Sequence, residues 1–240
     1  MFVFERIIAH RGASAYAPEN TFAAFNKAVD MGVSLIELDV MLSADGCPFI
    51  FHDTTLERTS DGKGMFESVS SEYIQSLSAG QWFGHNFEAE KVLTLKDVMS
   101  WFSKNQAQAC FELKPTPTSI EATVTSFLSH LNREWPASKP LPLISSFDQE
   151  ALRLCRSMMP ELKLAFLLKD WGPNDLKFAQ DLGCFSVHLS RRIVTRDRVK
   201  LLKENNFKVC VYTVNHRAEA LGYFDWGVDS VFTDYPDLFL

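Results

Sequence analysis

The sequence predicts an α/β fold, specifically a TIM barrel with a small insertion after the second strand. Short β-branched and apolar runs alternate with amphipathic helical stretches along the 240 residues, a pattern typical of βαβ units and a parallel sheet. Nine runs are strand candidates, and the turn sequence Asp45-Gly46 folds the third of them back on the second. Removing that antiparallel strand leaves eight parallel strands, which is the number in a TIM barrel.

The strand candidates are short runs rich in Ile, Val, Leu and Phe, the residue types that favour strands. In chain order they cover Arg6–Ala9, Leu35–Val40, Pro48–Phe51, Ala109–Leu113, Leu143–Ser146, Lys163–Leu167, Phe185–Leu189, Lys208–Thr213 and Ser230–Phe232.

The connecting segments show helical periodicity. Apolar residues recur at spacings of three and four over Thr21–Met31, Asp148–Met159 and Thr195–Asn205, so these stretches are predicted helices. A doubly wound open sheet is the alternative architecture, but no Gly-x-Gly-x-x-Gly follows the first strand. Residues 54–93 lack a regular strand–helix alternation. We therefore expect residues 1–240 to form a single barrel domain, with 54–93 as an insertion subdomain.

The Asp45-Gly46 turn also predicts a strand register. If these two residues form the whole loop, residues whose numbers sum to 91 face each other, so Asp39 faces His52. A slip of one residue would move every side chain of the strand to the other face.

Composition limits the class of protein. Hydrophobic residues make up 46% and charged residues 22% of the chain, as in globular proteins. The net charge of −6 argues against binding to nucleic acid or stable anchoring on an anionic membrane. The five cysteines form no Cys-x-x-Cys pair, and neither a signal-peptide pattern nor an apolar run of membrane-spanning length is visible. We expect a cytoplasmic protein with reduced cysteines.

Three carboxylates are predicted at one end of the barrel. In a TIM barrel the active site lies at the carboxyl ends of the strands. Glu37 and Asp39 are two residues apart on one strand and share a face, and Glu112 ends the next parallel strand. Such a cluster binds a hard divalent cation, Mg²⁺ or Ca²⁺, more readily than zinc. The alternative is a buried ionic network in which Arg11 and Lys114 pair with the carboxylates.

Two histidines end strands beside this cluster. His10 follows the first strand and His52 follows the return strand. Histidine exchanges protons near neutral pH, although a histidine at a strand end also serves structural roles. Arg11 and Lys114 are cations suited to a phosphate group. A cation, two basic side chains and two histidines together indicate cleavage of a phosphoryl ester.

A series of motifs runs in order along the chain. They are Ile7-Ile-Ala-His10-Arg11-Gly12, Ala17-Pro18-Glu19-Asn20-Thr21, Ile36-Glu37-Leu-Asp39-Val40, Phe51-His52-Asp53, Leu56-Glu57-Arg58-Thr59, Phe111-Glu112-Leu-Lys114-Pro115, Val211-Tyr212-Thr213-Val214-Asn215 and Phe232-Thr233-Asp234. In these motifs the chain resembles the glycerophosphodiester phosphodiesterase family, and most of all a cytosolic bacterial member linked to glycerol-phosphate uptake.

The resemblance implies a function and a role for each matching residue. It implies metal-dependent hydrolysis of glycerophosphodiesters, which are small molecules, to sn-glycerol 3-phosphate and an alcohol. Its implied roles are general acid and base for His10 and His52, metal ligands for Glu37, Asp39 and Glu112, and substrate contacts for Arg11, Lys114, Glu19, Asn20 and either Tyr212 or Trp226.

Two other functions stay open at this point. One is a lysophospholipase D-like phosphodiesterase that acts on lipids, although no amphipathic surface helix is evident. The other is a catalytically inactive barrel that binds a phosphate ligand. The sequence leaves open the head group, the metal ion, attack by water or through a cyclic phosphate, the division of roles between the histidines, and the oligomeric state.

Overall fold

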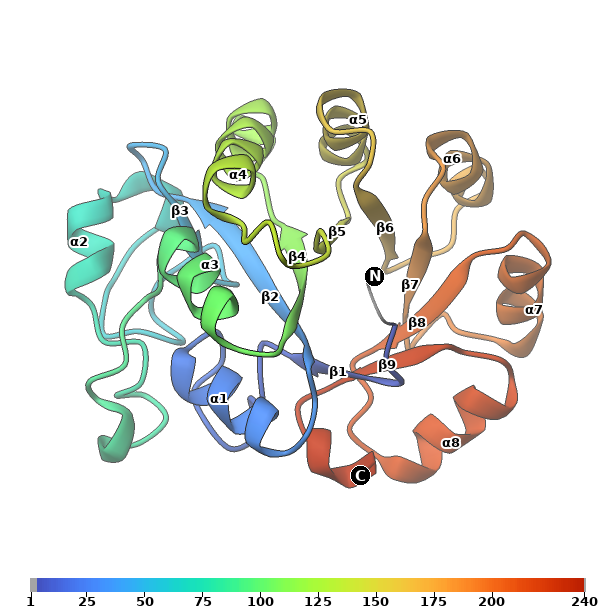
Figure 1. The fold of residues 1–240 in the computed structure, drawn as a ribbon, viewed down its shortest axis with the longest axis horizontal. Helices are drawn as coiled ribbons and strands as arrows, with labels where there is room; N and C mark the ends of the chain where they lie inside the picture. Colours follow the sequence, from blue (N-terminus) through green and yellow to red (C-terminus); the bar gives the residue numbers. More distant parts are fainter. Residues whose placement is uncertain (1–3, 240) are drawn as a thin grey trace.

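A computed structural model of the chain, which describes residues 4–239, is a closed barrel of parallel strands with helices around the outside (Figure 1). The strand β1 pairs with both β2 and β9, and this closes the sheet. The predicted TIM barrel is confirmed. Its parallel strands are β1 (Ile7–His10), β2 (Leu35–Leu42), β4 (Gln108–Leu113), β5 (Leu143–Ser146), β6 (Lys163–Leu168), β7 (Ser186–Ser190), β8 (Lys208–Tyr212) and β9 (Ser230–Thr233).

The short strand β3 (Pro48–Ile50) is antiparallel to β2, as the turn signal predicts. The strand ends differ from the predicted ranges by at most two residues. The largest difference is at β2, which continues to Leu42 because β3 extends its ladder of hydrogen bonds beyond Val40.

Helices alternate with the strands and form the outer ring. The described residues contain α1 (Phe22–Asp30), α2 (Ser71–Ser76), α3 (Leu95–Lys104), α4 (Ile120–Glu134), α5 (Gln149–Met158), α6 (Asp175–Leu182), α7 (Arg196–Glu204) and α8 (Arg217–Asp225). None of them is long and apolar enough to cross a membrane.

The three helices predicted from periodicity are present, each shorter by one residue at both ends. Thr21, Asp148 and Thr195 precede α1, α5 and α7, and the side chain of each accepts a hydrogen bond from a backbone N–H of the first turn. Such N-caps satisfy backbone donors that the helix itself leaves unpaired. The predicted ranges therefore include the capping residues, which lie just outside the helices themselves.

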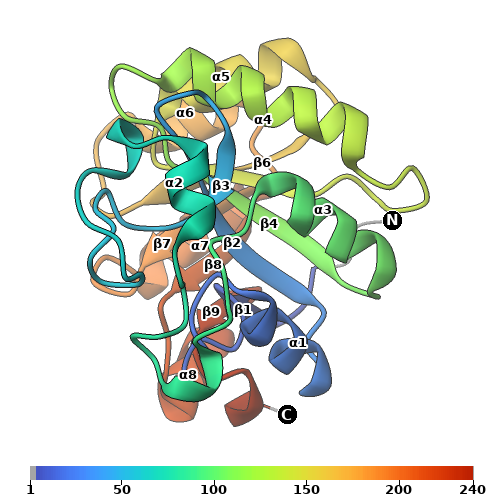
Figure 2. The ribbon, with the colours of Figure 1, turned by 90° about the vertical axis from the view of Figure 1, so that its left-hand side faces the viewer.

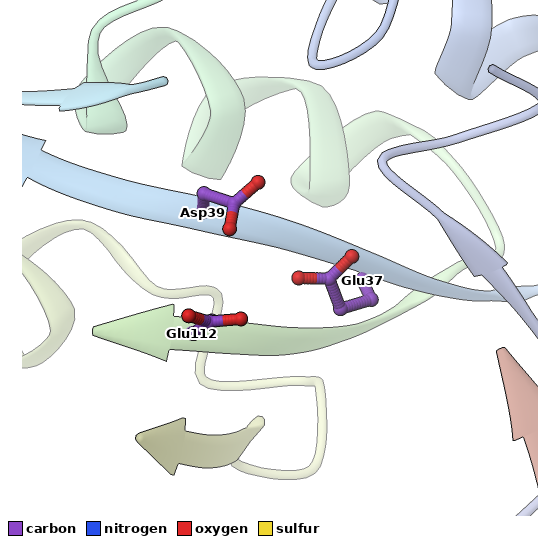
Figure 3. A group of neighbouring side chains, drawn as sticks. All are labelled: Glu37, Asp39 and Glu112. Carbon is purple, nitrogen blue, oxygen red and sulfur yellow. The ribbon is translucent and has the colours of Figure 1, made fainter. Parts of the chain in front are cut away.

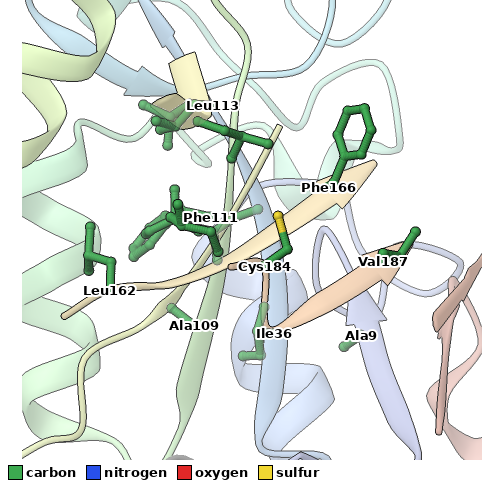
Figure 4. Close-up of a cluster of buried hydrophobic side chains, with 14 of the residues drawn as sticks. Ala9, Ile36, Ala109, Phe111, Leu113, Leu162, Phe166, Cys184 and Val187 are labelled. Carbon is green, nitrogen blue, oxygen red and sulfur yellow. The ribbon is translucent and has the colours of Figure 1, made fainter. Parts of the chain in front are cut away.

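The core has two layers separated by the barrel wall. Along each strand, alternate side chains point to opposite faces. Ile36 and Phe111 face the helices within the main apolar cluster (Figure 4). Leu35 and Cys110 face the barrel interior within a smaller cluster. Burial on both faces explains why the strands read as nearly continuous apolar runs.

The register of the β2–β3 hairpin differs from the prediction. Val40 pairs with Ile50, so partner numbers sum to 90 and Asp39 lies opposite Phe51 rather than His52. The predicted pairing of Asp39 with His52 is therefore wrong by one residue.

The turn itself explains this shift. Gly46 N donates to Ser43 O at 3.0 Å, Ser43 N donates to Cys47 O at 3.0 Å, and Gly46 has a left-handed φ of +77°. A turn followed by a left-handed glycine forms a three-residue loop. Residues 44–46 thus form the loop in place of Asp45 and Gly46 alone.

Residues 51–94, between β3 and α3, contain α2 and two short 3₁₀ turns. In Figures 1 and 2 the helix α2 lies outside the ring, beside β3. Phe49 of β3 packs with Phe66 and Ile74 of this segment in a separate small apolar cluster. The segment is therefore held against the outer face of the hairpin by its own core.

Candidate active site

A cavity opens at the carboxyl ends of the strands and has a volume of about 120 Å³. The side chains of Phe147, Leu167 and Phe232 give it an apolar wall. The remaining wall contains seven of the residues that the sequence singles out, namely His10, Arg11, Glu37, His52, Glu112, Lys114 and Tyr212. Asp39 is fully buried directly beside it.

The loop after β1 has an unusual backbone that places Arg11. Arg11 and Asn20 both have left-handed φ angles, 57° and 60°, and Asn20 N donates to Arg11 O at 3.0 Å. Between them, Gly12 has a φ of +84°, and a Cβ added there would lie 2.7 Å from the backbone of Ala24. Glycine is therefore required where this loop packs on α1.

The three predicted carboxylates converge. Glu37 and Asp39 project from β2, and Glu112 projects from the neighbouring β4, where it lies opposite Asp39 in register (Figure 3). Each offers a carboxylate oxygen, and these three atoms lie within 4.8 Å of one another. Burial and the charges of the other two carboxylates raise the pKa of Glu37 well above its usual range.

Two cations lie within reach of the carboxylates. Arg11 Nε is 3.2 Å from Asp39 Oδ2, and Lys114 Nζ is 3.0 Å from Glu112 Oε1 and 3.6 Å from Asp39 Oδ1. Burial opposes the ionisation of Asp39, but Arg11 and Lys114 outweigh it and hold its pKa at about 2. The backbone N–H of Arg11 donates to Glu37 Oε2 at 3.1 Å.

The donor set fits a hard divalent cation. Three carboxylates face two basic side chains, and the buried atom Asp39 Oδ1 accepts no hydrogen bond within the described residues. A buried oxygen without a donor is costly. All three ligands are oxygens, which Mg²⁺ and Ca²⁺ prefer. The ionic network that the sequence left as an alternative is also present, but it does not satisfy this oxygen.

Each histidine is held by a carboxylate. His10 Nδ1 lies 2.6 Å from Asp234 Oδ1, and His52 Nδ1 lies 2.5 Å from Asp53 Oδ1. A carboxylate only accepts, so Nδ1 carries the proton in each pair and Nε2 is left to exchange protons. Burial lowers the pKa of the His52 ring and outweighs the carboxylate of Asp39, which raises it.

Asp234 is held by further donors. Ser14 Oγ donates to its Oδ1 at 3.0 Å, and Asn215 Nδ2 donates to its Oδ2 at 2.6 Å. Burial opposes the ionisation of Asp234, but the bonds from His10, Asn215 and Ser14 outweigh it and hold the pKa at about 2. This carboxylate therefore stays ionised and keeps the His10 ring in one orientation.

Arg58 ties the insertion to the site. Its Nε lies 2.5 Å from Asp53 Oδ2, and its two terminal nitrogens lie 2.7 and 2.8 Å from the oxygens of Glu19. Glu19 in turn accepts from Arg11 at 2.8 Å. Arg58 thus fixes the carboxylate that orients His52 and the carboxylate that orients Arg11.

Sequence reasoning assigned no role to Asp234 or Arg58. Both occur in stretches that carry the family likeness, Phe232-Thr233-Asp234 and Leu56-Glu57-Arg58-Thr59, and that was the one signal available. Asp234 and His10 are 224 residues apart along the chain, and Arg58 and Glu19 are 39 residues apart.

The structure brings most of the secondary substrate candidates near the cavity. Glu19 and Asn20 contact site residues rather than lining the catalytic cavity, and Asn20 Nδ2 donates to Asp39 Oδ2 at 2.9 Å. Tyr212 lines the cavity with its ring 6.0 Å from that of Phe147. Trp226 is not brought to the site. It caps the far end of α8 and packs on Tyr223, at the amino-terminal end of the barrel.

Comparisons with known proteins point to one family. The glycerophosphoryl diester phosphodiesterase family matches residues 10–238. A glycerophosphodiester phosphodiesterase of Caldanaerobacter subterraneus is 32% identical over 234 residues, which cover 96% of this chain and 94% of that protein. One of the same name from Bacillus subtilis is 31% identical and covers 97% of this chain and 84% of its own length.

The fold agrees as well. The structure of a phosphodiesterase from Oleispira antarctica, in complex with the product sn-glycerol-3-phosphate, is 33% identical and matches with a TM-score of 0.94 over 98% of this chain and 94% of that chain. The chain belongs to the glycerophosphoryl diester phosphodiesterase family.

Proposed function

We propose that this protein hydrolyses glycerophosphodiesters to sn-glycerol 3-phosphate and an alcohol. The observation that carries the proposal is the convergence, in one cavity, of two carboxylate-held histidines, a cluster of three carboxylates and two basic side chains. The Oleispira relative, whose structure holds the product sn-glycerol-3-phosphate, supports the same substrate class.

The phosphate is held by Arg11 and Lys114. Both line the cavity, and both project over the carboxylate cluster. Charge-assisted hydrogen bonds from such groups stabilise the oxygens of a phosphodiester as negative charge builds on them. Glu19 and Asn20 act indirectly, because Glu19 holds Arg11 in place and Asn20 holds Asp39 in place.

Glu37, Asp39 and Glu112 would hold the divalent cation, Mg²⁺ or Ca²⁺. When bound, such an ion offsets the charge of the phosphate oxygens and activates an attacking oxygen. The chain's own contribution is a rigid oxygen-rich site, because Glu37 and Asp39 are fixed by the pleat of β2 and Glu112 by its register with Asp39.

The histidines transfer the protons. One accepts the proton of the attacking oxygen, from water or from the glycerol 2-hydroxyl, and the other donates a proton to the leaving alcohol. Asp234 and Asp53 hold the Nδ1 atoms of His10 and His52, so transfer takes place at Nε2. Tyr212 and Phe147 form an apolar wall on which the glycerol unit packs.

Alcohol release from a panel of glycerophosphodiesters is the direct test. We expect EDTA to abolish turnover and Mg²⁺ or Ca²⁺ to restore it. His10→Ala and His52→Ala should each lower kcat by about 10²- to 10⁴-fold, with the amount of bound metal measured in parallel. Turnover near that of the wild type in either variant would contradict its acid–base role.

The two alternatives predict different outcomes. A lysophospholipase D-like enzyme would prefer lysophosphatidylcholine to glycerophosphocholine, so the two are compared directly. An inactive phosphate-binding barrel would release no alcohol from any diester under any metal. The presence of both histidines and all three carboxylates in one place favours an active enzyme.

The proposal also covers the domain organisation, the type of substrate and the cellular compartment. Residues 1–240 act as a single barrel domain, with 54–93 as the insertion that carries Arg58. The substrate is a small molecule rather than nucleic acid or a membrane surface. The five cysteines are all free thiols, which suits the reducing cytoplasm.

A further inference from the structure

A second cavity adjoins the catalytic one on the side of β7 and β8. Its volume is about 450 Å³, and it shares Tyr212 and Thr213 with the catalytic cavity. Because Ser190 ends β7 and Tyr212 ends β8, this cavity opens at the same end of the barrel as the site. Its other lining residues are Ser190, Arg191, Arg192, Asn215 and His216.

The charge of this cavity is opposite to that of the whole chain. The chain has a net charge of −6, whereas none of the described residues that line this cavity is a carboxylate. Residues 191–198 read Arg-Arg-Ile-Val-Thr-Arg-Asp-Arg, with four arginines and one acid. Positive charge therefore gathers on the loop after β7 and on the first turn of α7.

The two arginines of the cavity are available to a ligand. Arg192 is exposed and pairs with no carboxylate among the described residues. Arg191 pairs with Glu219 at 3.6 Å, and both side chains are partly open to solvent. A guanidinium that lacks a close carboxylate partner is well suited to bind phosphate.

The backbone beneath these arginines is anchored. Arg191 N donates to Tyr212 O at 2.9 Å, and Arg192 N donates to Ser190 Oγ at 3.3 Å. Val194 N donates to Ser190 O at 3.1 Å and closes the turn. The backbone that carries both arginines is therefore held beside the wall that the two cavities share.

We propose that Arg191, Arg192 and His216, which we call the arginine subsite, bind a second phosphate of the substrate. The enzyme would then prefer glycerophosphodiesters that carry a further phosphate beyond the one that is cleaved. A substrate that spans the shared wall of Tyr212 and Thr213 places one phosphate in each cavity. This inference rests on the proposed function.

The test compares two substrates that differ by one terminal phosphate, glycerophosphoglycerol and glycerophosphoglycerophosphate. We expect a higher kcat/KM for the phosphate-bearing substrate. Arg192→Gln should lower the ratio of the two kcat/KM values about two- to fivefold, within the range for a solvent-exposed ion pair. Arg192→Lys should retain part of the preference, and 0.5 M KCl should weaken it in the wild type.

Arg196→Gln is the matched control. Arg196 lies on the same basic stretch, is exposed, and does not line the cavity, so this change removes the same charge and should leave the ratio unaltered. Equal losses in Arg192→Gln and Arg196→Gln, or equal losses on both substrates, would overturn the inference. Binding to phosphatidylglycerol vesicles is measured in parallel. If Arg192→Gln weakens only this binding and leaves the ratio of kcat/KM values unaltered, the inference is also overturned. The absence of turnover on both substrates in the wild type would instead contradict the proposed function.

Discussion

At the scale of single residues, the site depends on side chains that hold other side chains. His10 and His52 each have Nδ1 occupied by a carboxylate, and those carboxylates are themselves held by Asn215, Ser14 and Arg58. A histidine in such a pair keeps one tautomer and one ring orientation. In the proposed mechanism we therefore expect Asp234 and Asp53 to be positioning residues, which act on the reaction through the histidines.

Asp234→Asn should lower kcat about 10- to 100-fold while KM changes little, because the amide no longer fixes the tautomer of His10. The change should also shift the pH profile of kcat, which a purely structural defect would not do. Asp229→Asn is the control. Asp229 pairs with Lys203 and Lys208, away from the cavity. An unshifted pH profile in Asp234→Asn would contradict the positioning role.

The lowered pKa of Asp234 also predicts that the stability of the fold depends on pH. Its pKa is about 2 in the folded chain against 3.8 as the ordinary value. A depressed pKa gives stability that is present above the ordinary pKa and is lost as the pH falls through the folded value. We expect ionised Asp234 to contribute about 2 kcal/mol to the free energy of unfolding at pH 5 and about half of that at pH 3. Urea unfolding of the wild type and Asp234→Asn at both pH values measures this, and a constant difference would contradict it.

At the scale of elements, the loop between β1 and α1 sets the position of Arg11. Gly12 has a left-handed φ and no room for a Cβ against Ala24. Gly12→Ala should lower the free energy of unfolding by about 2–4 kcal/mol, from backbone strain and overpacking together. Urea denaturation gives the value, and the activity at saturating substrate should fall with it because Arg11 shifts.

Gly46→Ala separates these two causes. Gly46 also has a left-handed φ, at +77°, but no atom lies within 4 Å of an added Cβ. The cost should be about 1 kcal/mol, from backbone strain alone. Equal losses in Gly12→Ala and Gly46→Ala would show that contact with α1 contributes nothing.

The hairpin shows where prediction of elements fails. The Asp45-Gly46 signal correctly predicts a reversal between β2 and β3 but not its register. The hydrogen bonds of Ser43 add a third residue to the loop. His52 nevertheless lines the cavity, and Asp53 orients its ring.

At the scale of the whole molecule, a bound cation should stabilise the fold. The three carboxylates come from β2 and β4, so an ion held by them joins two strands of the barrel. At about 100 times its Kd, an ion that binds only the folded chain adds about 2.7 kcal/mol. For a chain of this size that is a rise in Tm of about 5 to 10 °C.

Thermal denaturation with and without Mg²⁺ or Ca²⁺ measures this directly and needs no substrate. Glu112→Gln should remove most of the rise, whereas Glu121→Gln, an exposed residue of α4, should leave it intact. A rise of equal size in Glu112→Gln would place the ion elsewhere.

The sequence alone determined the barrel, because eight parallel strands with helices between them follow from hydrophobic periodicity and one turn signal. It also predicted where the central polar side chains lie, because the carboxyl ends of neighbouring parallel strands open at the same end of a barrel. Glu37, Asp39 and Glu112 could be found in this way, because the pleat of a strand puts Glu37 and Asp39 on the same face of the sheet. Glu112 lies beside them because its strand is the next one in the sheet.

Only the tertiary structure decided the rest. The bond of His10 to Asp234 and the bridge of Arg58 join segments far apart in sequence, and no local pattern encodes such distances. The hairpin register depended on side-chain bonds within the turn, and Trp226 was separated from the site by the direction of α8. The arginine subsite lies beside the catalytic cavity because β7 and β8 are neighbours in the closed sheet. Local sequence specifies which elements form, whereas closure of the barrel determines which of their ends meet.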